Sequence, residues 1–443
     1  MSLVPPRTVE KLQATLHAKA KGSPGHRFHA LYDKVYRLDA LEYAYRLCRQ
    51  NGGAAGVDER TFEDIETYGH RRWLDELMEE LRMKRYRPEA VRRVHIPKPG
   101  QPGRTRPLGI PTIRDRVVMT ATTLVLAPIF EADLQPEQYA YRPNRSALDA
   151  VRHVHSLLKS RHWEVIDADM SGYFDTIPHT ELMKSVTRRI VDRQLLRLIK
   201  MWLQAPVEET DERGRRHRTT RNKDEGRGCP QGAPISPLLA NLYMRRFVLG
   251  WKAFGYEKRF RAKIVNYADD FVICCDGHAE EAMDVMRRMM RKLKLTINEE
   301  KTHVCRLPDD SFDFLGYTFG RCYSRKTGRR YIGQRPSKKK VVAVCRRISE
   351  WTSSRWGLLD EREQVARLNR LMVGWANYFC QGPVSNDYRR ITQHARERVR
   401  QWLRRKHKVQ GQGYARFPDE YLHEELGLIQ LRLCDRNVPW AQA

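Results

Sequence analysis

Three aspartates stand beside short apolar segments in a pattern that suits magnesium chemistry. Asp169 ends the apolar segment 163–168, and Asp269 and Asp270 lie between two apolar runs within residues 264–273. If these segments are neighbouring strands, their carboxylates reach the same end of one sheet and offer the hard oxygen ligands that Mg²⁺ prefers. Two such ions about 3.5–4 Å apart clamp the attacking and leaving oxygens of an in-line phosphoryl transfer.

An Asp-Asp pair also has an ordinary explanation, because aspartate caps turns and tolerates the left-handed backbone conformation. The apolar runs 264–267 and 271–273 favour the metal site instead. A carboxylate at the edge of a core costs free energy unless a partner compensates its charge.

The elements that would position these aspartates alternate between helix and strand. Apolar residues at helical spacing predict helices, and β-branched segments bounded by Pro and Gly predict strands. We predict helices over residues 31–49, 71–85, 116–132, 179–203, 236–249 and 279–294, the fifth with Ser236 as N-cap and Pro237 as its first helical residue. We predict strands over residues 163–169, 261–275 (two strands around a turn at 268–270) and 312–320 (a strand pair), and a hairpin with a basic tip over 91–115. Residues 207–227 are predicted to form a loop or an exposed hairpin.

This order predicts an α+β fold, in which an antiparallel sheet carries helices on one face. We divide the chain into an N-terminal helical extension (1–65), a central catalytic region (66–320) and a mostly helical, basic region (321–443). The last region contains 27 Lys and Arg against 11 Asp and Glu, so it contributes 16 of the net 28 positive charges.

The charge of the whole chain implies an acidic partner. The sequence has 82 Lys and Arg against 54 Asp and Glu, and nucleic acid is the partner that such a surplus favours. The alternative is an anionic membrane surface, for which a basic amphipathic helix with few acids would be typical.

The cysteines and the N-terminus bear on the compartment. Nine cysteines are scattered without a Cys-x-x-Cys pair, which argues against a zinc ribbon and favours reduced thiols inside a cell. The sequence lacks an apolar stretch of membrane-spanning length and begins without the apolar core of a signal peptide. We therefore expect a cytoplasmic protein without a membrane partner.

Six sequence blocks in a fixed order resemble bacterial group II intron reverse transcriptases, also called maturases. Tyr-Ala-Asp-Asp at 267–270 is similar to the metal-binding box of that family, and Asp169 with Phe174-Asp175 is similar to its first carboxylate motif. The other blocks are Pro-Gln-Gly at 230–232 followed by Ser-Pro-Leu-Leu-x-Asn at 236–241, and the segments 106–112, 141–146 and 314–317. The resemblance covers nearly the whole chain, including the C-terminal segments 371–379 and 402–407.

The resemblance implies a right-hand polymerase with fingers and palm, followed by an α-helical thumb or maturase domain. It implies an RNA-directed DNA polymerase that uses two Mg²⁺ ions, an RNA template, which could be a group II intron RNA, a DNA or RNA primer, and dNTPs. It also implies roles for individual residues: Asp169, Asp269 and Asp270 as catalytic metal ligands; Lys98, Arg106, Phe174, Gln231 and Lys301 around the nucleotide, with Phe174 as the steric gate against ribonucleotides; Phe314, Leu315, Gly316 and Tyr317 as the primer grip; and Arg404, Arg405 and Lys406 on RNA phosphates.

Several alternatives stay open at this stage. Phe174 could be a core residue, and Lys98 and Arg106 could belong to a solvated hairpin. The aromatic residues at 375–379 are predicted to be core rather than an RNA-stacking surface. The protein could also be a stand-alone reverse transcriptase used in repair or defence, or a splicing cofactor that only binds RNA. Because no segment resembling the family's endonuclease follows the basic region, we do not expect target-strand cleavage.

Overall fold

The computed structural model describes residues 3–97, 103, 105–211, 213–324 and 327–432. The chain divides into two compact units. Unit 1 comprises Met1–Ser146, Ala168–Ile273 and His278–His303, and unit 2 comprises Ala147–Asp167, Cys274–Gly277 and Val304–Ala443.

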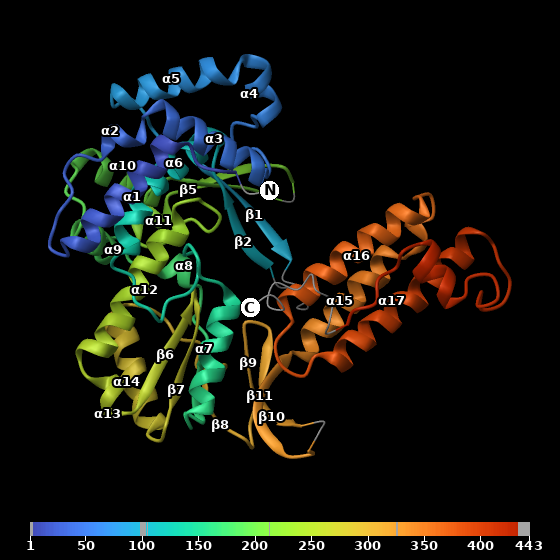
Figure 1. Ribbon diagram of the computed structural model, residues 1–443. Coiled ribbons are helices and arrows are strands. Elements are labelled where there is room, and N and C mark those ends of the chain that lie inside the picture. The colour runs from blue at the N-terminus through green and yellow to red at the C-terminus, as the bar shows by residue number, and fades with distance from the viewer. Residues whose placement is uncertain (1–2, 98–102, 104, 212, 325–326, 433–443) are drawn as a thin grey trace. The chain divides into compact units, whose positions relative to one another are not determined.

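Unit 1 is built mainly from helices. They are α1 (Arg7–Gly22), α2 (Tyr32–Val35), α3 (Leu38–Asn51), α4 (Phe62–Tyr68), α5 (His70–Arg82), α6 (Ile113–Glu131), α8 (Tyr173–Thr176), α9 (His179–Thr187), α10 (Arg193–Leu203), α11 (Arg221–Asp224), α12 (Ser236–Ala253), α13 (Tyr256–Arg259) and α14 (Ala279–Lys292). Helix α6 is the central one, since α1 and α3 lie along it (Figure 1). Val117, Val125 and Ile129 of α6 are fully buried, which fits a helix that is apolar on most of its circumference.

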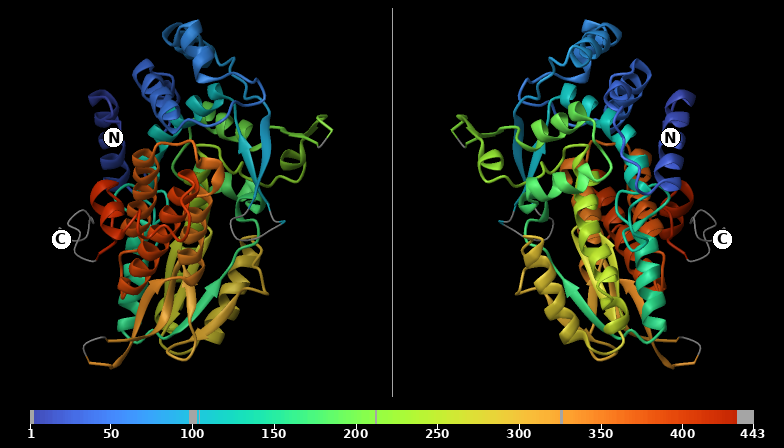
Figure 2. Two further views of the ribbon diagram at one scale, coloured as in Figure 1. Left: turned by 90° about the vertical axis from the view of Figure 1, so that its right-hand side faces the viewer. Right: turned by 90° about the vertical axis from the view of Figure 1, so that its left-hand side faces the viewer.

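One sheet of unit 1 has the strand order β2-β1-β4-β5. Strands β1 (Val91–Pro97) and β2 (Thr105–Ile110) form an antiparallel hairpin in which Ile96 lies opposite Arg106. Strand β4 (Val207–Thr210) pairs with β1 in parallel, and β5 (Arg216–Thr219) pairs with β4 antiparallel. The yellow-green β4–β5 hairpin extends away from the rest of unit 1 in both views of Figure 2.

A second sheet has the strand order β6-β7-β3-β8. Its strands are β6 (Ala262–Tyr267), β7 (Asp270–Cys275), β3 (Glu164–Ala168) and β8 (His303–Arg306). Strands β6 and β7 are joined by a two-residue turn at Ala268 and Asp269, and Asp169 follows β3 directly. The sequence prediction of two strands around this turn is confirmed.

Unit 2 contains the third sheet and a helical core. The sheet, of order β11-β10-β9, is antiparallel, with β9 (Phe312–Phe314), β10 (Tyr317–Tyr323) and β11 (Arg330–Pro336). Besides α7 (Ala147–Lys159), the helices are α15 (Lys338–Trp351), α16 (Glu361–Tyr378) and α17 (Ser385–Lys406). These last three pack around Ile348, Leu368, Met372, Ile391 and Val399; the pair on α16 is four residues apart and the pair on α17 eight, a spacing that places each pair on one face of its helix.

Four details of the sequence prediction are wrong. The helix predicted over 31–49 is interrupted between α2 and α3, and the one over 179–203 is interrupted at Asp192, whose side chain caps α10 by accepting from the amides of Gln194 and Leu195. Strand β11 (Arg330–Pro336), which pairs with β10, lies in the region predicted to be mostly helical, where no strand was expected. Ser236 is not the N-cap of α12, because it lies within the first turn and its hydroxyl donates to the carbonyl oxygen of Pro230 at 2.8 Å.

Candidate functional site

Asp169 is held through its backbone and its side chain by residues 298–302 of unit 1. Its amide donates to Thr302 Oγ1 at 3.2 Å, and its carbonyl oxygen accepts from the amide of Asn298 at 2.8 Å. Lys301 Nζ donates to Asp169 Oδ2 at 3.0 Å, while 38% of the Asp169 side chain and 52% of the Lys301 side chain stay exposed. The structure therefore brings together two residues that the sequence selected 132 positions apart.

Asp269 and Asp270 lie on a tight turn that the preceding strand stabilises. Ala268 has a φ of +58°, a left-handed conformation that is uncommon for a residue with a side chain. The side-chain amide of Asn266 donates to the carbonyl oxygens of Ala268 (2.9 Å) and Asp270 (3.3 Å), across the turn. Asp269 is partly buried and Asp270 is exposed, so both carboxylates lie at the surface end of the buried strands.

Tyr141 and Arg106 lie within electrostatic range of this turn. Partial burial raises the pKa of Tyr141, the Asp269 carboxylate raises this pKa further, and the Arg106 guanidinium lowers it. Arg106 itself is exposed on β2. The charges of the turn and of the basic hairpin thus have opposite effects on the pKa of the same tyrosine.

A magnesium ion at this site would depend on the carboxylate oxygens of Asp169, Asp269 and Asp270. Among the described residues, no cluster of three or more His, Cys, Asp or Glu side chains is close enough together to hold a metal ion. The donors themselves suit Mg²⁺, because Asp169, Asp269 and Asp270 offer hard carboxylate oxygens from a single compact unit, and none of them is enclosed in the core. The cation that pairs with Asp169 in this structure is Lys301.

Phe174 and the Pro230–Gly232 segment are joined through backbone contacts. Phe174 is 8% exposed on α8, and its carbonyl oxygen accepts from the amide of Cys229 at 2.7 Å. The carbonyl oxygen of Gln231 accepts from the amide of Gly109 on β2 at 2.6 Å. A Cβ on Gly232 would stand 2.5 Å from the carbonyl oxygen of Gly109, so only glycine fits this approach. The segment that carries Gln231 is therefore fixed against the basic hairpin.

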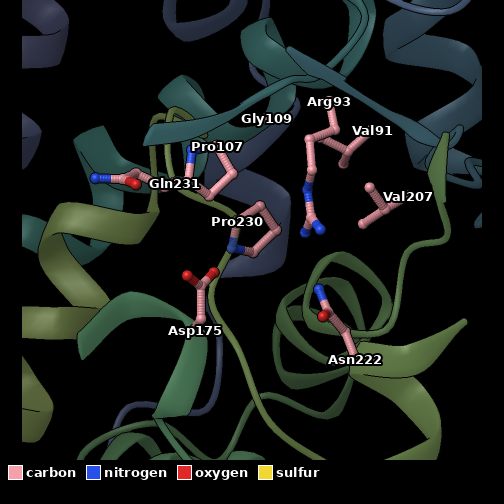
Figure 3. A pocket seen from close by; sticks show the side chains of 9 residues that line it. All are labelled: Val91, Arg93, Pro107, Gly109, Asp175, Val207, Asn222, Pro230 and Gln231. Carbon is pink, nitrogen blue, oxygen red and sulfur yellow. The ribbon is translucent and has the colours of Figure 1, made fainter. Parts of the chain in front are cut away.

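A small pocket lies below this contact (Figure 3). Its lining residues are Val91, Arg93, Pro107, Gly109, Asp175, Val207, Asn222, Pro230 and Gln231. The side chains of Arg93, Asp175 and Asn222 point into it, whereas the side chain of Gln231 extends away from them (Figure 3). Burial raises the pKa of Asp175, and the positive charges of Arg93 and Arg221 oppose that shift.

The predicted primer grip belongs to unit 2, where it forms a turn packed on helices. Leu315 and Gly316 both have positive φ angles, +50° and +83°. Tyr378 Oη donates to the carbonyl oxygen of Leu315 at 2.8 Å, and Tyr317, which is fully buried, donates its hydroxyl to the carbonyl oxygen of Tyr378 at 2.5 Å. Phe379 is buried and Trp375 and Tyr378 are partly buried, and they contact Tyr317 of this turn and one another, so the prediction of core residues is confirmed for Phe379.

The three cations predicted to contact RNA lie at the end of α17. Arg404 donates to the carbonyl oxygen of Gly411 at 2.8 Å, and the Lys406 ammonium contacts the carbonyl oxygen of Leu359. Arg405 is exposed. Lys98 lies outside the described residues.

Sequence reasoning gave no role to four residues that shape this region: Gln138, Tyr141, Asn241 and Asn266. Three of them are amides with 2% exposure or less, and each donates a hydrogen bond to a backbone carbonyl oxygen. The signal that could have selected them is an amide inside an otherwise apolar stretch, as Asn266 is within 264–273.

Comparison with known proteins identifies the family. The family model "Reverse transcriptase (RNA-dependent DNA polymerase)" matches residues 96–319, and "Group II intron, maturase-specific domain" matches residues 341–417. Protein YkfC of Escherichia coli K12 is 32% identical over 371 residues, which is 75% of this chain and 93% of YkfC. Group II intron-encoded protein LtrA of Lactococcus lactis is 27% identical over 353 residues, 66% of this chain and 56% of LtrA. A putative COX1/OXI3 intron 1 protein of Saccharomyces cerevisiae is 27% identical over 332 residues, 63% of this chain and 38% of that protein.

The two family models together include Asp169, Asp269 and Asp270 and the maturase helices, but the reverse transcriptase model begins after Val91 and Arg93 of the pocket. The chain spans little more than half of LtrA, although it spans nearly all of YkfC. Within the described ranges, no helix has the length and apolar character required to cross a bilayer. The chain belongs to the reverse transcriptase family and joins a reverse transcriptase domain to a group II intron maturase domain.

Proposed function

We propose that this protein is an RNA-directed DNA polymerase that extends a DNA or RNA primer on an RNA template with dNTPs. The observation that carries the proposal is the arrangement in unit 1, where Asp169 with Lys301 and the turn of Asp269 and Asp270 belong to one compact body. In a chain of the reverse transcriptase family, such carboxylates are best explained as the acids of nucleotidyl transfer.

Asp169, Asp269 and Asp270 would hold the metal ions in this reaction. Two Mg²⁺ ions, when bound, would lower the pKa of the primer hydroxyl and neutralise charge on the triphosphate. Lys301, which forms an ion pair with Asp169, would supply a positive charge near the departing pyrophosphate. Asp270 has further interactions of its own in the structure.

The remaining side chains would bind and select the nucleotide. Lys98 and Arg106 come from the basic hairpin and would bind the triphosphate by charge-assisted hydrogen bonds. Phe174 is held by the hydrogen bond from Cys229 and would exclude a 2′-hydroxyl by its bulk. Gln231 would contact the nucleotide or template from a backbone that β2 holds in place.

A second function is favoured by the maturase-specific domain at 341–417: assistance to the splicing of a group II intron. This domain coincides with the helices α15, α16 and α17, and the region 321–443 carries a net charge of +16 from 27 basic and 11 acidic residues. Such a surface would bind RNA phosphates, with Arg405 as an exposed contact. The name of LtrA, a group II intron-encoded protein, supports the same role.

The experiment that tests the proposal is primer extension on an RNA template with Mg²⁺, in parallel reactions with dNTPs and with rNTPs. We expect extension with dNTPs only. If the protein is folded and binds the template–primer yet adds no nucleotide, that result would contradict the proposed polymerase activity. An intron-splicing assay with the same protein would then decide whether it is a splicing cofactor or neither.

A further inference from the structure

Three buried amides surround the backbone that carries Asp269 and Asp270. Gln138 and Asn266 are fully buried, and Asn241 is 2% exposed. An amide in such a position costs free energy unless hydrogen bonds replace those it made with water. The groups to which these amides bond therefore indicate what they stabilise.

Asn266 acts on the turn itself. Its Nδ2 donates to the carbonyl oxygens of Ala268 and Asp270, at 2.9 and 3.3 Å, so a single side chain spans the turn from within β6. This bridge offsets the strain of Ala268 at a φ of +58°, a conformation that persists only where the surroundings impose it. Its Oδ1 is buried and has no hydrogen-bond partner in the structure. The side chain therefore does not serve to donate or accept hydrogen bonds for other buried groups of the core, and its bonds go to the turn.

The backbone of Asn266 is bound to a second segment. Its amide donates to the carbonyl oxygen of Glu137 at 2.9 Å, and its carbonyl oxygen accepts from the amide of Tyr139 at 3.0 Å. Residues 135–141 thus run beside β6 and lead to Tyr141. The charge of Asp269 raises the pKa of this tyrosine.

The other two amides fix this second segment to helix α12. Gln138 Nε2 donates to the carbonyl oxygen of Asn241 at 2.9 Å, and Asn241 Nδ2 donates to the carbonyl oxygen of Ala140 at 2.6 Å. Helix α12, the segment 135–141 and the turn are therefore connected by consecutive hydrogen bonds, which resist displacement more strongly than isolated ones.

We propose that Asn266 is a positioning residue: its buried amide sets the geometry of the turn that presents Asp269 and Asp270 to the metal ions, and Gln138 and Asn241 hold the segment that supports it. The inference rests on the proposed polymerase function. It explains why position 266 of this strand holds an amide instead of an apolar residue. An apolar side chain would pack equally well but would leave the turn without the hydrogen bonds that span it.

The test compares Asn266→Ala and Asn266→Asp with wild type and with Gln364→Ala. Both Asn266 variants lose the N–H donors, and Asn266→Asp keeps the side-chain size. Gln364 is a fully buried amide of unit 2 that bonds the carbonyl oxygen of Trp351, so its removal controls for the loss of any buried amide. Three quantities are measured: the Mg²⁺ concentration for half-maximal single-turnover extension, the affinity for Mn²⁺ by electron paramagnetic resonance with a dideoxy-terminated primer and a dNTP, and the template–primer Kd.

We expect both Asn266 variants to need at least about fivefold more Mg²⁺ and to bind Mn²⁺ at least about fivefold more weakly, with a template–primer Kd within twofold of wild type. Gln364→Ala should match wild type in both metal measurements. Metal dependence and Mn²⁺ affinity within twofold of wild type in Asn266→Asp would overturn the inference, and so would an equal shift in Gln364→Ala. If wild type adds no nucleotide, the polymerase proposal fails, and the Mn²⁺ titration still decides the role of Asn266.

Discussion

Replacement of Gly232 by alanine is the perturbation whose effect the structure defines most closely. Gly232 has a φ of +109°, where a residue with a Cβ is strained by about 1–3 kcal/mol. The new Cβ would also stand 2.5 Å from the carbonyl oxygen of Gly109 and 2.9 Å from Leu108 Cδ1. The first of these neighbours is backbone and cannot rotate away, so overpacking adds about 1–3 kcal/mol more.

The least costly relief is for the segment 230–232 to move away from β2. That movement breaks the 2.6 Å hydrogen bond between the Gly109 amide and the Gln231 carbonyl oxygen and displaces Gln231. We therefore expect Gly232→Ala to lower the melting temperature by about 5 °C or more, using about 2–4 °C per kcal/mol for a body of this size. We also expect a KM for dNTP that is raised several-fold.

Gly214→Ala is the matched control. Gly214 also has a positive φ, +76°, but a Cβ there would meet no atom within 4 Å. In this variant, stability should fall only by the backbone strain of the positive φ, and the KM for dNTP should equal that of wild type. Calorimetry at a fixed scan rate and steady-state kinetics measure both effects. Equal melting temperatures for the two variants, together with a wild-type KM in Gly232→Ala, would refute the close approach of Gly232 to Gly109.

Three further outcomes are expected. Phe174→Ala should incorporate ribonucleotides, because a smaller side chain leaves room for the 2′-hydroxyl; an unchanged preference in paired dNTP and rNTP extensions would remove Phe174 as the gate. Burial raises the pKa of Cys229 to about 12, so at pH 8 about one thiol in 10⁴ is ionised and iodoacetamide should label it only after unfolding, as mass spectrometry can show. Because the unfolded thiol ionises first, near pH 8.5, this shift should also lower stability as pH rises from about 8.5 towards 12. Template–primer affinity should fall by about 10³-fold or more between about 50 mM and about 200 mM salt if six or more phosphates are contacted, and a flat response would argue against the basic helices as the RNA-binding surface.

The amino-acid sequence predicts the parts of this site whose local pattern is clear. The strands on either side of the Asp269 turn follow from two short apolar runs, the β1–β2 hairpin follows from β-branched residues that alternate with Pro, Gly and Arg, and both are present. The pairing of Lys301 with Asp169 did not follow, because the distance between two side chains far apart in the chain depends on how residues 296–302 return to β3.

Other features are set by tertiary contacts that override local preference. Ser236 precedes a proline as an N-cap often does, yet it lies inside α12, where its hydroxyl donates to the carbonyl oxygen of Pro230. Residues 330–336 are polar and basic like the helices after them, but they form β11 and pair with β10. The role of Asn266 depends on a left-handed alanine two residues away, which the sequence pattern does not predict.

The central claim, that Asp169, Asp269 and Asp270 make this protein a polymerase, is tested most directly by Asp269→Asn in primer extension. Wild type, Asp269→Asn and the control Asp284→Asn, which removes a carboxylate of α14 that pairs with Arg287 at 3.6 Å, are compared on an RNA template with Mg²⁺ and dNTPs. We expect extension by wild type and by Asp284→Asn, no detectable extension by Asp269→Asn, and template–primer affinity within a few-fold in all three. Extension by Asp269→Asn at the wild-type rate, or loss of its RNA binding together with its fold, would contradict the catalytic role of these aspartates.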